Sequence, residues 1–110
     1  MIVTVEQVKL GAANYISQEV WKRATGFKKC LYWIASELAP EYVQYWVDKA
    51  YSDPVMLKKF FDESGNVRLD EVYGLAKRSV ENSGQFLAFG LIFNETDVDR
   101  LYSYIKSTTI

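Results

Sequence analysis

The 110-residue sequence contains no histidine, two prolines and a single cysteine, Cys30. Without histidine the chain has no imidazole base, no histidine-centred catalytic triad and no Cys/His zinc site. A single cysteine excludes an intramolecular disulfide, and we expect Cys30 to be a reduced, half-buried thiol. These absences remove several of the commonest routes to hydrolytic and zinc chemistry.

Long apolar runs and an excess of one charge are also missing. The most hydrophobic stretch, residues 30–35, is about two turns of helix, far short of the ~20 residues that span a bilayer. Residues 1–5 lack the basic and apolar pattern of a secretory signal. The 13 basic and 14 acidic side chains give a net charge of −1, without the basic excess typical of nucleic-acid-binding proteins. The sequence therefore predicts a cytoplasmic protein with no membrane association.

Aromatic residues, by contrast, are abundant. Three Trp, eight Tyr and six Phe make up 15% of a chain that is 49% hydrophobic. A chain of this length hides roughly two thirds of its unfolded surface on folding, which is enough for one core without disulfides or metal. We therefore expect a single domain over residues 1–110, with a helical half (1–61) and a strand-helix-hairpin-helix half (62–110).

Hydrophobic periodicity predicts that the first half is helical. Apolar residues recur at spacings of three and four, and Pro40 is expected to break or kink the pattern. Thr4 and Gln7 have the spacing of a capping box, and Asp53 before Pro54 marks the start of a short helix. The predicted helices span residues 5–24, 27–38, 41–51 and 54–61.

The same periodicity assigns a buried face to the helix over residues 27–38. Phe27, Leu31, Ile34, Ala35 and Leu38 share this face, which we expect to pack in the core. Aromatic rings outside the apolar faces are candidates for a protein interface, because Tyr and Trp are enriched at interfaces. The candidates are Tyr32, Trp33, Tyr42, Tyr45 and Tyr51. The alternative is that a kink at Pro40 turns these rings toward the other helices.

The second half mixes strands and helices. Asp70 is expected to cap a helix that ends at Gly84, and Asn94 is expected to cap the last helix. Residues 86–93 are predicted to form two short strands that turn about Gly90. The prediction is an α+β fold in which the helices pack with a small sheet (67–69, 86–89 and 91–93) and two further helices (71–83 and 95–106). Pairing of the hairpin with residues 67–69 or with another chain is left open.

The polar residues of the second half do not match known reactive sites. Asp62, Ser64 and Asn66 alternate as in a calcium-binding loop, but the sixth position is Val67 instead of glycine and the twelfth is Tyr73 instead of glutamate. We therefore interpret residues 62–70 as a capped turn and expect no metal site.

Catalytic motifs are also lacking. Asp97 and Asp99 could form a carboxylate pair, but residues two apart point roughly 200° apart around a helix. The sequence has no Ser-x-x-Lys element, no glycine-flanked serine elbow and no glycine-rich phosphate loop. We expect no catalytic residues and no cofactor.

A basic cluster of Lys22, Arg23, Lys28 and Lys29 lies among aromatic residues. Such a cluster can bind single-stranded nucleic acid through phosphate attraction and base stacking. The first two cations, however, are accounted for by the last turn of a helix, whose dipole favours positive charge. Nucleic-acid binding is therefore a weaker interpretation.

The runs DESGNVRLDEVY (62–73) and NETDVDRLYSYI (94–105), separated by a helix and an apolar hairpin, resemble small proteins encoded in phages and prophages of Firmicutes. A Lys28-Lys29 pair before an apolar helix is a further shared feature. The resemblance implies a phage or prophage gene expressed in a bacterial host cell, among tail and structural genes. Those proteins have no assigned activity, so no functional residue is carried over, and the aromatic-rich middle of this chain departs from their Ala/Leu-rich pattern.

These observations predict a non-enzymatic structural or protein-interaction protein that binds a protein partner or another copy of itself. The alternative is a small phage-encoded inhibitor of a host defence or replication protein. A nucleic-acid-binding module or an enzyme is less well supported. A virion component would be present in purified particles, whereas an inhibitor would be made early and would bind a host protein in the cytoplasm.

Overall fold

A computed structural model describes residues 1–108 of the chain and confirms the α+β class. The elements are β1 (Ile2–Val3), α1 (Val5–Tyr15), a π-helical turn η1 (Ile16–Val20), a 3₁₀ turn η2 (Trp21–Arg23), α2 (Lys28–Tyr51), α3 (Pro54–Phe60), β2 (Val67–Arg68), α4 (Leu69–Ser83), β3 (Phe86–Ala88), β4 (Leu91–Phe93) and α5 (Glu95–Ser107). Over residues 1–108, no helix combines the length and the apolar character needed to cross a membrane.

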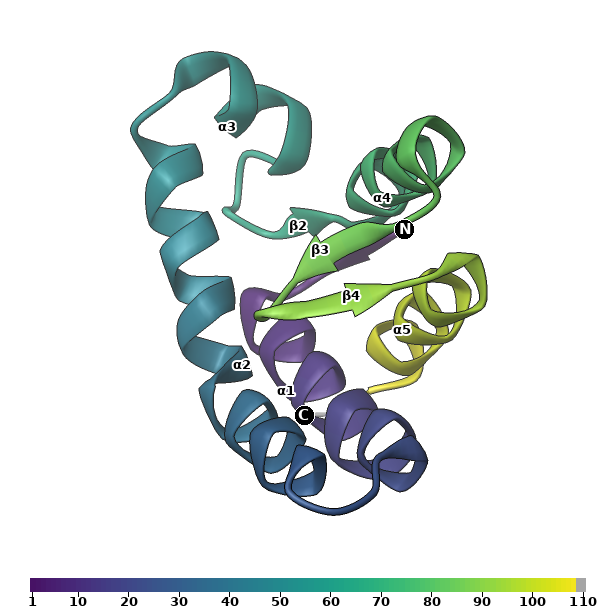
Figure 1. Ribbon diagram of the computed structural model, residues 1–110. Coiled ribbons are helices and arrows are strands. Elements are labelled where there is room, and N and C mark those ends of the chain that lie inside the picture. The colour runs from purple at the N-terminus through teal and green to yellow at the C-terminus, as the bar shows by residue number, and fades with distance from the viewer. Residues whose placement is uncertain (109–110) are drawn as a thin grey trace.

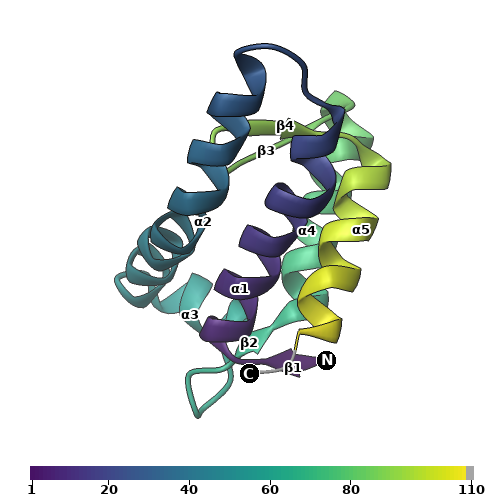
Figure 2. The same cartoon turned by 90° about the horizontal axis from the view of Figure 1, so that it is seen from below.

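Helix α1 occupies the middle of the molecule. It lies between α2 and α5, and α4 packs beside α5 (Figure 2). The hairpin of β3 and β4 begins beside α4 and α5 and carries its turn across to α2 (Figure 1). This arrangement brings the hairpin turn near the middle of α2, where residues 89 and 42 are in contact.

The strands form two separate two-stranded antiparallel sheets. Strand β1 pairs with β2, with Val3 opposite Val67, and β3 pairs with β4. The prediction of one sheet from residues 67–69, 86–89 and 91–93 is therefore wrong. Strand β2 pairs instead with a two-residue strand near the N-terminus, which is too short to show an alternating pattern. Burial of both valines explains the pairing, since it places them in the same core.

Helix α2 is continuous through Pro40, contrary to the two separate helices predicted over residues 27–38 and 41–51. Proline lacks an N–H and its ring crowds the carbonyl four residues earlier, which costs about 3 kcal/mol in a straight helix. The axis of α2 changes direction about midway along its length (Figures 1 and 2), which is the usual response to an internal proline. The helix survives because residues on both sides of Pro40 belong to core clusters that also include residues of α1.

The predicted caps are largely confirmed. Thr4 and Gln7 form a reciprocal capping box, Asp53 accepts a hydrogen bond from the Val55 amide, and Gly84 ends α4 in the left-handed conformation. The exception is Asp70, which lies in the first turn of α4 instead of capping it. Helix α4 begins at Leu69, and the side chain of its N-cap residue, Arg68, makes no capping hydrogen bond. A carboxylate in the first turn still complements the helix dipole.

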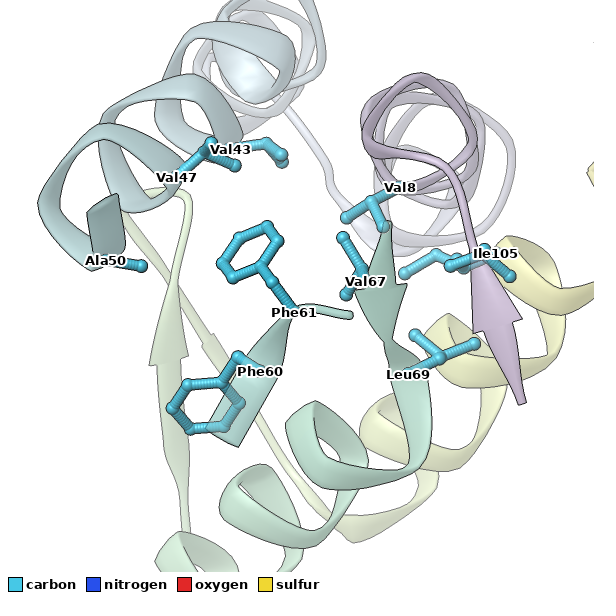
Figure 3. Close-up of a cluster of buried hydrophobic side chains, with 10 residues drawn as sticks. Val8, Val43, Val47, Ala50, Phe60, Phe61, Val67, Leu69 and Ile105 are labelled. Carbon is cyan, nitrogen blue, oxygen red and sulfur yellow. The ribbon is translucent and has the colours of Figure 1, made fainter. Parts of the chain in front are cut away.

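Two hydrophobic clusters form the core, and each draws residues from both halves of the chain. In the first cluster, Phe61 points toward Val43 and Val47 of α2, while Val67 lies near Val8 of α1 (Figure 3). The second cluster lies farther along α1 and centres on residues with almost no exposed surface: Ala12, Tyr15, Ile16, Ala39 and Phe93. The rows of small residues in the second cluster allow α1 and α2 to approach closely.

Candidate protein-interaction face

The main departure from the sequence prediction is the orientation of the first half of α2. Of the face predicted to be buried, only Ala35 is buried, whereas Phe27, Leu31, Ile34 and Leu38 are exposed. The exposed fraction is 76% for Phe27, 50% for Leu31, 42% for Ile34 and 37% for Leu38. The prediction that this stripe packs in the core is therefore wrong.

The buried row of α2 consists of smaller side chains. Ala35, Ala39, Val43 and Val47 follow one another at intervals of four residues and are all buried. Rows with this spacing form the ridges through which helices most often pack. Small side chains on the ridge let α2 approach α1, and the larger residues about a third of a turn away are left facing outward. Tyr42 continues this outward stripe and is 43% exposed.

The outer side of the β-hairpin continues the apolar surface. Leu87 and Ile92 are directly opposite each other in the β3–β4 pair and are 66% and 64% exposed. Directly paired residues in an antiparallel sheet project from the same face. Phe86 and Phe93, paired one step along, belong to the opposite face and pack into the second core cluster. The hairpin is therefore apolar on both faces, although only one is covered.

The turn of the hairpin is held in a strained conformation. Phe89 and Gly90 have φ values of 56° and 71°, the pattern of a two-residue turn of type I′. Phe89 was predicted to end a strand, but it forms the first turn residue, and a non-glycine residue in this region costs about 1–3 kcal/mol. Its ring lies 6.3 Å from that of Tyr42 and 6.2 Å from that of Phe93, both edge to face. These contacts hold the turn against α2.

A groove runs between the exposed stripe of α2 and the hairpin. Its volume is about 420 Å³, and the side chains that line it are mostly apolar. The lining residues are Lys28, Leu31, Tyr32, Ile34, Ala35, Leu38, Tyr42, Phe89, Gly90, Leu91 and Ile92. We call the surface formed by Phe27, Leu31, Ile34, Leu38, Tyr42, Leu87 and Ile92 the α2–hairpin face.

A polar cluster centred on the buried carboxylate of Asp97 lies beside this groove. The Asp97 carboxylate accepts hydrogen bonds from the Tyr15 hydroxyl at 2.7 Å and from the Arg23 guanidinium at 2.6 Å. Burial opposes ionisation of this carboxyl, but the hydrogen bonds that it accepts outweigh that penalty and hold the pKa of Asp97 below its usual value. Burial and the bond to Asp97 raise the pKa of Tyr15.

The π-helical turn η1 connects two members of this cluster. A π turn inserts one extra residue per turn and rotates the chain that follows it. Tyr15 precedes η1 and Arg23 follows it, and both reach the same carboxylate. A cavity of about 150 Å³ beside Arg23 and Asp97 shares Leu91 and Ile92 with the groove. The cluster therefore lies next to the wall of the groove formed by β4.

The other polar residues considered from the sequence have structural partners. Asp62 accepts hydrogen bonds from the amides of Ser64 at 2.9 Å and Asn66 at 2.8 Å, which makes a capped turn. In the part of the chain that the structure describes, no three His, Cys, Asp or Glu residues gather as a metal site. Lys29 lies over the ring of Trp21, with its ammonium 4.6 Å from the centroid.

The thiol of Cys30 is exposed, not half-buried as predicted. Position 30 lies outside the buried row of small residues on α2, so no part of the core covers it.

Only two of the five predicted interface residues line the groove. Tyr32 is half-buried and Tyr42 is exposed, and both line the groove. Trp33, Tyr45 and Tyr51 are 56%, 60% and 52% exposed but do not line it. Tyr51 instead packs on Phe61 with a centroid distance of 5.3 Å, and Lys49 lies over the Tyr45 ring.

Sequence reasoning missed most of the α2–hairpin face. The spacing of the stripe on α2 was recognised, but it was assigned to the core because periodicity shows only that residues share a face. Leu87 and Ile92 lie next to Phe86 and Phe93 in the sequence, so adjacent apolar residues must project from opposite faces of the hairpin. An apolar residue at every position of a short hairpin is the signal that both of its faces need covering.

Comparison with known proteins finds no matching family model, curated protein or solved structure.

Proposed function

We propose that this chain is a non-enzymatic protein-interaction protein that binds through the α2–hairpin face. The supporting observation is the extent of that face. With about 200 Å² of accessible area for a fully exposed large apolar side chain, its seven residues expose roughly 750 Å². The largest apolar patch on a typical monomer is about 300–600 Å², and larger patches mark interaction sites.

The shape and chemistry of the groove also favour protein binding. It is wide enough for apolar side chains of a partner, and Lys28 is the one charged residue among those that line it. The centres of protein interfaces are similarly depleted of charge and rich in aromatic residues. The Phe89 ring packs on Tyr42 and holds the hairpin turn against α2, so this part of the face is formed before a partner arrives. Preformed surfaces avoid the entropic cost of ordering loops on binding.

Photo-crosslinking in cells tests this proposal. A benzoyl-phenylalanine replacing Ile92 would lie on the face. The control position is Val55 on α3, which is 76% exposed and does not line the groove. We expect ultraviolet irradiation to give protein adducts from position 92 and few from position 55. Equal adduct yields from the two positions would contradict the proposal.

The cellular context is a narrower part of the same proposal. The resemblance of residues 62–105 to small phage and prophage proteins supports a role among virion structural proteins. The chain would then be found by mass spectrometry in purified particles, in a fixed ratio to other structural proteins. Its absence from particles, together with an adduct to a host protein from position 92, would favour a host-directed inhibitor.

A further inference from the structure

We propose that the partner of the α2–hairpin face is a second copy of this chain, bound with the two α2 helices antiparallel about a two-fold axis. This inference rests on the proposed function and identifies its partner. It is carried by three properties of the face: its area, the presence of both a knob and a groove, and the distribution of charge along α2.

The area matches what a stable dimer needs. Specific interfaces of standard size bury about 800 Å² on each partner, close to the roughly 750 Å² that the seven apolar residues of the face expose. Interfaces of homodimers are also more apolar than those of transient complexes. The face would be covered almost completely by one partner of similar extent, and a copy of the same face has that extent.

A two-fold interface requires the same surface to carry complementary shapes, because each patch contacts its own copy. The α2–hairpin face meets this requirement. Phe27 precedes α2 and has 76% of its area exposed, while the groove of about 420 Å³ runs along the helix from Lys28 to Tyr42, where the hairpin turn borders it. One copy therefore offers an aromatic knob and the other a groove large enough to receive it, and the two-fold axis repeats the contact.

The spacing of the stripe sets the register. Counted along the chain, Phe27 and Tyr42 lie equally far from the middle of the stripe, and so do Leu31 and Leu38. Antiparallel packing about that midpoint places Phe27 of one copy at Tyr42 of the other, where the hairpin turn closes the groove. It also places Leu31 against Leu38. Every large residue of the stripe then meets an apolar residue of the second copy.

Charge distinguishes antiparallel from parallel packing. The start of α2 carries Lys28 and Lys29, whereas its middle carries Glu37 and Glu41. Within the described residues, Lys28, Glu37 and Glu41 form no ion pair. Parallel packing would bring like charges of the two copies together, which is unfavourable at short range. Antiparallel packing brings the basic end of each helix to the acidic middle of the other.

Sedimentation velocity tests the dimer directly. We expect the wild-type chain, of 12.7 kDa, to shift from monomer to dimer as its concentration is raised to about 200 µM. Leu31→Asp places a charge in the centre of the face and should raise the dimer dissociation constant about tenfold or more. Val55→Asp, at a 76% exposed position outside the face, is the matched control and should leave it unchanged. Circular dichroism melts identify any variant that fails to fold.

Disulfide formation tests the orientation. In a Cys30→Ser background, chains carrying Leu31→Cys and chains carrying Leu38→Cys are mixed and oxidised. Antiparallel packing predicts that the mixed 31–38 disulfide forms faster than either self-disulfide. Faster formation of the 31–31 disulfide would overturn the proposed orientation.

A wild-type chain that stays monomeric over the whole concentration range would overturn the dimer, as would dimerisation of Leu31→Asp with wild-type affinity. These failures are separable from failure of the proposed function. A monomer whose position 92 crosslinks to a different protein refutes the dimer and leaves the interaction face intact. A monomer with no excess of adducts at position 92 refutes both.

Discussion

The hydroxyl of Tyr15 donates a 2.7 Å hydrogen bond to the carboxylate of Asp97, a residue 82 positions away in the chain. This bond joins the end of α1 to the first turn of α5. The same carboxylate accepts from Arg23 and from the Asn94 amide. One buried acidic side chain therefore ties the N-terminal helices, the second core cluster and the start of the last helix together.

Removal of this charge should destabilise the protein strongly. In Asp97→Asn, the guanidinium of Arg23 loses its ionic partner and the capping box with Asn94 is weakened. We expect the free energy of unfolding, measured by urea denaturation, to fall by about 2 kcal/mol, because the buried Asp97 site loses its charge-assisted hydrogen bonds while the half-exposed Arg23 can be solvated. Asp99→Asn is the matched control: that carboxylate is about half exposed and pairs with Lys77 at the surface, so the loss should stay below about 1 kcal/mol. Equal losses would contradict the central role of Asp97.

The same cluster predicts a pH dependence. An aspartate in an unfolded chain titrates near 3.9, and the pKa of Asp97 in the folded protein is lower. Its ionised form therefore stabilises the fold above about pH 4, and this stabilisation is lost as the pH falls through the folded-state pKa. The difference in unfolding free energy between wild type and Asp97→Asn should shrink as urea denaturation is repeated from pH 7 to pH 2. A difference that is constant over this range would refute the assignment.

At position 89 of the hairpin turn, substitution by glycine should destabilise the protein less than substitution by alanine. Both Phe89→Gly and Phe89→Ala delete the ring that packs on Tyr42 and Phe93. Alanine keeps the strain of a positive φ at this position, whereas glycine does not. We expect Phe89→Gly to be more stable than Phe89→Ala by about 1 kcal/mol in urea denaturation, and both to be less stable than wild type. Higher stability of the alanine variant would show that the turn changes conformation.

Two helical glycines should respond oppositely to the same substitution. A Cβ atom at Gly11 would lie 2.6 Å from the Cα of Ile105, so Gly11→Ala forces α1 and α5 apart and should cost about 1–3 kcal/mol. At Gly74 the nearest atom is the end of the Arg78 side chain at 3.7 Å. Gly74→Ala should therefore stabilise α4 by about 0.5–1 kcal/mol. Thermal melts of the two variants would show shifts of opposite sign, and a stabilised Gly11→Ala would contradict the close helix contact.

Charge reversal should reveal how the two copies are oriented. Lys28→Glu with Lys29→Glu makes the whole of the first half of α2 acidic and should weaken the proposed dimer. Adding Glu37→Lys and Glu41→Lys in the same chain reverses the charge of both the start and the middle of α2 and should restore the dimer. Sedimentation at low salt measures both effects, which should fade as salt is added. A quadruple variant as weak as the double variant would exclude antiparallel packing.

The local features of the fold were predictable because they depend on neighbouring residues. The caps at Thr4, Asp53 and Asn94 and the stop at Gly84 satisfy backbone groups within three or four positions, so the sequence around each is sufficient. The kink at Pro40 is equally local. What could not be predicted is that α2 remains one helix there, because packing on both sides of the proline supports it.

The sequence by itself determined which residues of α2 share a face, and the tertiary structure decided which face is covered. Phe27, Leu31, Ile34 and Leu38 have the spacing of a buried stripe, and that spacing is the same whether their own chain or a partner buries them. Only the approach of α2 to α1 through Ala35 and Ala39 leaves the larger residues outside. The pairing of Val3 with Val67 and the convergence of Tyr15 and Arg23 on Asp97 have the same physical origin: they join residues far apart in sequence, which local propensity cannot specify.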